Sequence, residues 1–183
     1  MKERILVTGG TGYIGSHTVV ELQNSGYDVV IVDNLSNSSA DVVDNIEKVS
    51  GIRPAFEKLD CLDLEGMDKL FTKYPGIKGI IHFAASKAVG ESVQKPLLYY
   101  RNNLVSLINL LELMPKHGVE GIIFSSSCTV YGQPDVLPVT EEAPIKKAES
   151  PYGNTKQINE EIIRDTVASG APINAIMLRY FNP

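Results

Sequence analysis

The sequence predicts an α/β fold in which a parallel sheet carries helices on both of its faces. Short apolar runs, rich in β-branched residues, alternate along the chain with longer segments whose apolar residues recur at helical spacing. The first apolar run ends in a group of glycines that opens a helical segment, and the second run ends in an aspartate. Because parallel strands need long crossover connections, which are usually helices, this alternation favours a doubly wound sheet.

Length and composition favour a single globular domain. The chain has 183 residues, of which 43% are hydrophobic and 21% charged, and a chain of this size buries roughly 70% of its unfolded surface. The net charge of -5, without any lysine-rich or arginine-rich block, argues against nucleic acid as the main partner. The start, Met1–Arg4, contains an acid and precedes only a short apolar run, so we expect neither a signal peptide nor a membrane span.

The two cysteines predict neither a disulfide framework nor a metal site. Cys61 and Cys128 lie far apart in the sequence, without the spacing of metal-ligand clusters. This usage is typical of a reduced, cytoplasmic protein.

The first strand and helix enclose a predicted phosphate-binding turn. We expect a strand over Arg4–Thr8 and a helix over Tyr13–Asn24, with Gly9, Gly12 and Gly15 at the transition. Glycines at such a turn permit a tight bend, close backbone approach to a pyrophosphate, and close packing of helix on strand. The positive end of the helix dipole then faces the anion, so the turn predicts a dinucleotide site.

The second strand, Asp28–Asp33, ends in a carboxylate. Asp33 is placed to accept hydrogen bonds from the hydroxyls of an adenosine ribose and to repel a 2′-phosphate. No lysine or arginine follows within Asn34–Ser39, so the sequence favours NAD over NADP as the cofactor. The structural alternative is that Asp33 only caps or solvates the strand end.

The remaining elements follow the same alternation of apolar runs and helical segments. In order, we expect a helix at 40–50, a strand at 54–58, a helix at 64–74, a strand at 78–85, a helix at 96–114, a strand at 121–127, a surface loop at 132–147, a helix opened by 150–156, and a strand at 173–180.

Polar residues beside these elements have competing interpretations. Asp60, at the end of the third strand, is a candidate for hydrogen bonding to an adenine amino group, whereas Asp63 is best explained as a helix N-cap. We expect His82, within an apolar strand, to be a packed core histidine. Lys87 either meets the charge of a pyrophosphate or is solvated.

The helix predicted at 96–114 has apolar residues on more than one face, which favours packing against a partner helix as well as the sheet. Asn102 and Asn103 interrupt this apolar surface. Buried amides need partners, and both a cofactor and backbone carbonyls are open alternatives.

A candidate catalytic group combines Ser127 with Tyr152 and Lys156. The fifth strand ends in Ser125–Ser127, at the edge of the sheet where ligands bind in open α/β folds. Tyr152 and Lys156 are four residues apart and therefore share one helix face. A nearby ammonium and the positive nicotinamide of an oxidised cofactor would lower the tyrosine pKa from about 10 and make it a general base. Ser127 would bridge a substrate hydroxyl to Tyr152 or relay its proton.

Six segments together form a recognisable pattern: Thr8–Gly15, Asp33, Asp60–Asp63, Ser125–Ser127, Tyr152–Lys156 and Arg179–Pro183. The pattern resembles the extended short-chain dehydrogenase/reductase family, and the match extends over the whole chain. It implies a Rossmann-type doubly wound parallel sheet. The family's members continue into a smaller C-terminal domain that holds most of the uridine nucleotide, so residues 1–183 are expected to be the NAD-binding domain that carries the catalytic residues, with turnover by this chain alone in doubt.

Within that family, the segments 33–37, 82–92 and 125–132 resemble the UDP-hexose 4-epimerases. The related 4,6-dehydratases have an Asp-Glu pair where this chain has Cys128 and Thr129. The resemblance implies NAD-dependent interconversion of UDP-glucose and UDP-galactose through a 4-keto intermediate, with Tyr152 as the acid and base, Lys156 on the nicotinamide ribose and Ser127 on the 4′-hydroxyl. Epimerisation of N-acetylated or uronic-acid UDP-sugars, and a non-catalytic NAD-binding domain, are the alternatives.

The resemblance also implies a set of binding residues and an assembly. Asn182 falls at a substrate-binding position, as do Ser127 and Tyr152, and the family commonly forms homodimers through long helices. The positions implied to bind the cofactor are Gly12, Tyr13, Ile14, Asp33, Asn34, Asn37, Ser38, Asp60, Cys61, Phe83, Ala84, Lys87, Asn102, Tyr152 and Lys156.

Overall fold

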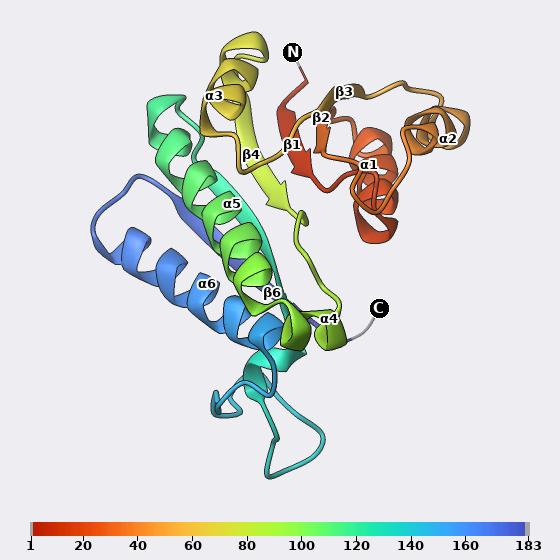
Figure 1. Cartoon of the computed structure of the whole chain (residues 1–183). Coiled ribbons are helices and arrows are strands. Elements are labelled where there is room, and N and C mark those ends of the chain that lie inside the picture. Colours follow the sequence, from red (N-terminus) through yellow and green to blue (C-terminus); the bar gives the residue numbers. More distant parts are fainter. Residues whose placement is uncertain (1, 182–183) are drawn as a thin grey trace.

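The fold is a six-stranded parallel sheet with helices on both faces, as predicted (Figure 1). The computed structural model describes residues 2–181. In sheet order β3-β2-β1-β4-β5-β6, all neighbouring strands are parallel. The first three strands are added in one direction and the last three in the other, so a topological switch point lies between β1 and β4. The strands are β1 (Arg4–Thr8), β2 (Asp28–Asp33), β3 (Ala55–Lys58), β4 (Ile77–His82), β5 (Gly121–Ser127) and β6 (Asn174–Tyr180).

The helices lie in the crossover connections between successive strands. They are α1 (Tyr13–Asn24), α2 (Asp41–Ser50), α3 (Leu64–Lys73), α4 (Val89–Gln94), α5 (Pro96–Lys116) and α6 (Pro151–Ala168), with a 3₁₀ turn, η1, at Cys128–Tyr131. Figure 1 shows α5 and α6 side by side along one face of the sheet. Sequence periodicity missed α4 and η1, because segments of six and four residues are too short to display an amphipathic stripe.

Two apolar cores, one on each face, hold the layers together. On one face Val19 of α1 and Ile46 of α2 pack with Val7 and Ile31 of the sheet. The other, larger core includes residues of α3, α5 and α6 packed on the opposite side of the same strands. Strands buried on both faces are apolar at nearly every position, which is why the strand segments lack alternation in the sequence.

The strand predicted at 78–85 is shorter in the structure, because β4 ends at His82. The last β1 pair is Thr8 with His82, after which the chain of β1 turns away at Gly9. The amide of Phe83 still donates to the carbonyl of Thr8 at 3.0 Å, but the amide of Ala84 reaches only the side-chain hydroxyl of Thr8, at 3.4 Å. The segment 83–88 therefore leaves the sheet as a loop.

Two structural assignments made from the sequence are confirmed. The Asp63 carboxylate accepts a hydrogen bond from the Gly66 amide at 2.9 Å and caps α3. His82 is 2% exposed, and its Nδ1 lies 2.7 Å from the Thr8 hydroxyl. Burial, with a smaller contribution from the charge of Lys156, lowers the pKa of His82 to about 3. Among the described residues, no helix combines the length and apolarity needed to cross a membrane.

Candidate functional site

A cleft of about 900 Å³ opens at the carboxyl ends of the strands. It is lined by the loops that follow β1, β2, β3 and β4, by the end of β5 and by the first turns of α6. This is where ligands bind in open α/β sheets, and the volume falls in the range of about 300–1,000 Å³ typical of ligand pockets.

The glycine turn forms one wall of the cleft. Gly9 has a φ of +70°, and a Cβ at this position would lie 2.7 Å from the backbone nitrogen of Ala84. A Cβ on Gly15 would lie 2.2 Å from the carbonyl oxygen of Gly9. Gly12 is the N-cap of α1 and supplies no side chain to cap it, so the positive end of the helix faces the cleft with Gly12, Tyr13 and Ile14 along its lining.

Asp33 lies at the end of β2 and is 8% exposed. Its Oδ1 accepts hydrogen bonds from the amide of Leu35 at 2.9 Å and the hydroxyl of Ser38 at 3.3 Å, and its Oδ2 accepts from the amide of Thr11 at 3.2 Å. The carboxylate thus ties the loop after β2 to the glycine turn. An ionised carboxylate has about four acceptor positions, so Oδ2 keeps capacity for a further donor from the cleft.

The loops after β2 and β3 meet beside the cleft. Asn34 donates to Oδ2 of Asp60 at 2.9 Å, and the amide of Leu62 donates to Oδ1 at 2.9 Å. Asn34, Asn37, Asp60 and Cys61 all line the cleft. Ser38 lies behind it, where its hydroxyl contacts Thr11 and Asp33.

Burial raises the pKa of the Cys61 thiol to about 12, with the charges of Asp60 and Asp33 adding to the effect. Cys61 is therefore a neutral thiol near pH 7. Its side chain packs in the larger core beside the cleft, and its backbone carbonyl accepts a hydrogen bond from Asn109 at 2.9 Å.

The loop after β4 is held by amides of α5. Asn103, 1% exposed, accepts from the amide of Ser86 at 2.8 Å, donates to its carbonyl at 2.9 Å, and donates to the hydroxyl of Thr155 at 3.0 Å. Asn103 therefore satisfies protein groups, whereas its neighbour Asn102 lines the cleft. Phe83, Ala84 and the exposed Lys87 line it as well.

The three candidate catalytic residues meet at one end of the cleft. Ser127, Tyr152 and Lys156 all contribute to its lining. Lys156 is 3% exposed, and its ammonium donates to the carbonyl oxygen of Ser125 at 2.6 Å while lying 5.8 Å from the centre of the Tyr152 ring. Burial lowers the pKa of Lys156 to about 8, so the ammonium predominates at neutral pH.

The surroundings of Tyr152 in the protein itself oppose its ionisation, and the pKa lowering expected with an oxidised nicotinamide bound stays a prediction. Burial raises the pKa of Tyr152, an effect that the Ser127 hydroxyl opposes and the nearby Cys128 reinforces. The ammonium of Lys156 is held on the Ser125 carbonyl and does not hydrogen-bond to the phenol.

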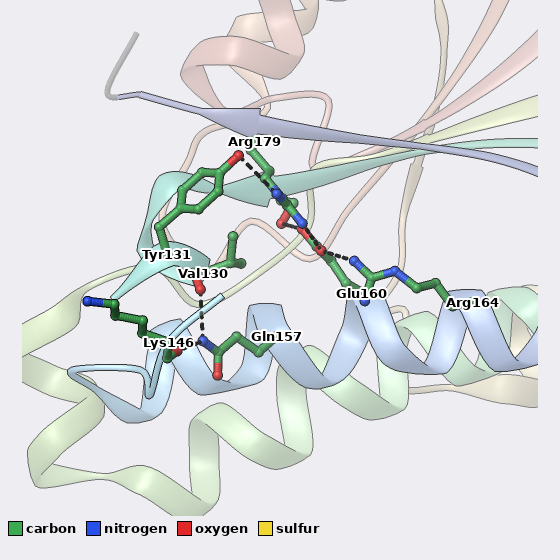
Figure 2. A network of polar contacts seen from close by, with 8 residues as sticks. Val130, Tyr131, Lys146, Gln157, Glu160, Arg164 and Arg179 are labelled. Carbon is green, nitrogen blue, oxygen red and sulfur yellow. Dashed lines mark hydrogen bonds and ion pairs between the residues drawn. The ribbon is translucent and has the colours of Figure 1, made fainter. Parts of the chain in front are cut away.

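Several residues of this region were missed from the sequence. Tyr180 and Thr129 line the cleft, and Glu160 of α6, fully buried in the network of Figure 2, accepts a hydrogen bond from the cleft-lining Ser126. The available signal for Glu160 was its spacing of four residues from Lys156, which places both on one helix face. Asn182, predicted to bind substrate, lies outside the described residues. Within residues 2–181, no group of three or more His, Cys, Asp or Glu side chains is arranged to hold a metal ion.

Comparison with known proteins places this cleft in a family. The family model of the NAD dependent epimerase/dehydratase family matches residues 5–183. The chain is 50% identical over 181 residues to UDP-glucose 4-epimerase of Dictyostelium discoideum, covering 99% of this chain and 52% of that protein. It is 51% identical to UDP-glucose 4-epimerase of Bacillus subtilis, covering 98% and 52%. The chain thus spans about half the length of the curated relatives it matches.

Solved structures agree with this assignment. UDP-glucose 4-epimerase of Stenotrophomonas maltophila, crystallised with NAD and formylated UDP-arabinopyranose, superposes with a TM-score of 0.95 at 46% identity over 99% of this chain and 53% of that chain. The enzyme of Bifidobacterium longum, in complex with NAD+ and UDP, gives a TM-score of 0.95 at 47% identity over 98% and 53%. With the family model matching nearly the whole sequence, the chain belongs to the NAD dependent epimerase/dehydratase family.

Proposed function

We propose that the protein containing this chain binds NAD and epimerises UDP-hexoses at C4, interconverting UDP-glucose and UDP-galactose in galactose metabolism. The observation that carries the proposal is the meeting of Ser127, Tyr152 and Lys156 at one end of a cleft formed by dinucleotide-type loops. Relatives about twice as long as this chain are named UDP-glucose 4-epimerases, which supports the choice of substrate.

We expect NAD to lie along the cleft. The turn at Gly9 and Gly15, where a Cβ would collide with backbone, allows close approach of a pyrophosphate to the start of α1. Asp33 keeps an acceptor position for a ribose hydroxyl, and Asp60 lies beyond it, on the side proposed for the adenine. When bound, NAD supplies the acceptor and later the donor of the hydride at C4 of the sugar.

The chain's own residues would move the proton. Tyr152 accepts the proton of the 4′-hydroxyl and returns it after the sugar has presented its other face, while Ser127 orients that hydroxyl. Lys156 contributes its positive charge beside the phenol and a donor for the nicotinamide ribose. Neither Cys128 nor Thr129 has the carboxylic acid side chain that a dehydration would need.

The direct test uses the protein expressed from the complete reading frame that contains residues 1–183. Incubated with UDP-galactose and no added NAD, it is expected to form UDP-glucose without net NADH, as followed by chromatography and absorbance. Absence of interconversion would refute the proposal.

A second substrate class is favoured by two of the structural relatives. A UDP-Glc/GlcNAc 4-epimerase of Campylobacter jejuni has 37% identity, and a UDP-N-acetylglucosamine 4-epimerase of Methanobrevibacter ruminantium has 31%. Turnover of UDP-galactose and of its N-acetyl analogue should be compared in parallel. Faster turnover of the N-acetyl sugar would favour this alternative.

For residues 1–183 alone, we propose an NAD-binding domain whose catalytic activity needs the rest of the protein. Calorimetric titration with NAD is expected to show saturable binding, and the Gly15→Ala variant serves as the matched control. No heat at millimolar NAD would contradict this.

We also propose a homodimer that buries the outer face of α5. Leu97, Val105 and Ile108 of this helix are between 36% and 81% exposed, and pairing with a second copy would remove this apolar surface from water. Val105→Glu is expected to shift the mass measured by solution scattering from dimer to monomer, and a monomeric parent protein would argue against the proposal.

A cytoplasmic location is proposed from the two free cysteines, to be tested by cell fractionation.

A further inference from the structure

A buried carboxylate connects α6 to the ends of two strands. Glu160 is fully buried, and its Oε1 accepts hydrogen bonds from the Ser126 hydroxyl at 2.6 Å and from Nε of Arg179 at 2.9 Å. Its Oε2 accepts from Arg179 at 2.7 Å and from Arg164 at 2.6 Å. Four donors, three of them charged, satisfy the buried charge (Figure 2).

The strand residues that Glu160 holds are paired with each other. Ser126 of β5 and Arg179 of β6 are register partners, and both donate to the same oxygen of Glu160. The next pair in register is Ser127 with Tyr180, and both of these residues line the cleft. Glu160 therefore holds the strand pair one residue before Ser127 and Tyr180.

On the helix, Glu160 follows Lys156 by four residues and Tyr152 by eight, so the three side chains share one face of α6. Lys156 is attached to the carbonyl of Ser125, and Glu160 is attached to the hydroxyl of Ser126. The helix thus has two consecutive attachment points on β5, and Tyr152 lies one turn beyond them.

The turn after Ser127 belongs to the same network. Arg179 donates to the hydroxyl of Tyr131 at 2.9 Å, and its guanidinium lies 4.8 Å from the centre of that ring. Tyr131 ends η1, which begins directly after Ser127. Ser127 is therefore held on both sides, through Ser126 before it and through η1 after it.

We propose that Glu160 is a positioning residue that, through Ser126 and Arg179, holds the Ser127 hydroxyl in place relative to the Tyr152 phenol. The inference rests on the function proposed above. Stability alone is a poor explanation for this group, because a buried ion pair often stabilises no better than apolar residues of the same volume.

The test compares Ser126→Ala and Glu160→Gln with Glu161→Gln, an exposed acid on the same helix. In the protein from the complete reading frame, Ser126→Ala is expected to lower kcat about tenfold, and Glu160→Gln further, because small misplacements of reacting groups are costly. KM for UDP-galactose and the affinity for NAD should stay within about twofold of the parent, and Glu161→Gln should match the parent throughout. All rates are expressed per folded molecule, and the folded fraction of each variant is determined by thermal unfolding.

A second measurement separates positioning from a merely structural role. Ultraviolet titration of each protein, minus the same protein carrying Tyr152→Phe, reports the pKa of Tyr152. Since the Ser127 hydroxyl lowers this pKa, loosening Ser127 is expected to shift it upward in Ser126→Ala and leave it unchanged in Glu161→Gln.

Unchanged kcat per folded molecule in Ser126→Ala, or an unchanged Tyr152 pKa, overturns the inference. If Glu160→Gln does not fold, Ser126→Ala decides alone. If the parent protein does not interconvert UDP-sugars, the proposed function has failed, and the titration by itself decides whether Glu160 positions Ser127.

Discussion

At the scale of single residues, the glycine turn requires positions without a side chain. Gly15 lies in the first turn of α1, where even one methyl group would collide with the carbonyl of Gly9. The helix can therefore start directly beneath the strand end only if this residue has no side chain.

Gly15→Ala is expected to destabilise the chain by about 1–3 kcal/mol, the usual cost of overpacking, and to weaken NAD binding at least about tenfold. The matched control is Gly90→Ala in α4, where an added Cβ meets no heavy atom within 4 Å. Urea unfolding and calorimetry measure the two effects. Equal behaviour of the two variants would contradict this account of the turn.

Tyr152→Phe removes the proposed proton acceptor and keeps the ring. We expect kcat to fall roughly 10²–10⁴-fold, the usual contribution of a general acid and base, with little change in NAD affinity. Tyr27→Phe, outside the cleft, is the control for losing a phenol. Steady-state turnover of UDP-galactose measures both, and a Phe variant with near-parental kcat would remove Tyr152 from the mechanism.

At the scale of elements, α5 braces the loops that surround the cleft. Asn109 donates to the carbonyls of Cys61 at 2.9 Å and Leu62 at 3.1 Å, and Asn103 bonds both backbone groups of Ser86. One rigid helix thus sets the relative positions of the loops after β3 and β4. Buried amides can do this because each carries donors and an acceptor that match exposed backbone groups.

Asn103→Leu is expected to lower the free energy of unfolding by about 2–4 kcal/mol, because buried polar groups of Ser86 and Thr155 lose their partner. Glu112→Leu, an exposed change on the same helix, should cost less than about 0.5 kcal/mol. Urea denaturation compares them, and hydrogen exchange of the Ser86 amide should accelerate only in Asn103→Leu. A slow Ser86 amide in that variant would show that α5 is not the brace.

At the scale of the whole molecule, a buried histidine in the central sheet makes the stability depend on pH. His82 sits in β4 beneath the cleft, buried and neutral, with its folded pKa lowered from 6.5 to about 3. Below pH 6.5 His82 binds a proton in the unfolded chain, whereas in the folded chain it stays neutral down to about pH 3. The stability contributed by neutral His82 is therefore present above pH 6.5 and is lost as the pH falls from 6.5 to 3.

His82→Gln is expected to flatten the fall in unfolding free energy between about pH 6.5 and pH 3 by up to about 5 kcal/mol, at the cost of lower stability at neutral pH. His17→Gln, which replaces an exposed histidine, is the matched control. Urea unfolding along a pH series measures both variants, and equal slopes would show that His82 is not the titrating group.

The order and type of the long elements could be predicted from the sequence, because each buries apolar residues at its own period. Six strands lie where apolar runs predicted them, and Asp63 caps α3 as expected. The strand predicted at 78–85 was too long, because its end depends on where the neighbouring β1 stops. Proximity of Ser127, Tyr152 and Lys156 was predictable, since strand ends and crossover helices meet at one edge of a parallel sheet.

The sequence by itself determined the doubly wound sheet, the glycine turn and the residue types that face the cleft, because all of these follow from local periodicity and chain order. Only the tertiary structure decided that Glu160 binds Ser126 and Arg179, that Asn103 holds Ser86, and that burial raises the Tyr152 pKa. Hydrogen-bond partners far apart in sequence and the solvation of a charge depend on how the layers pack. Neither can be read from the local sequence pattern.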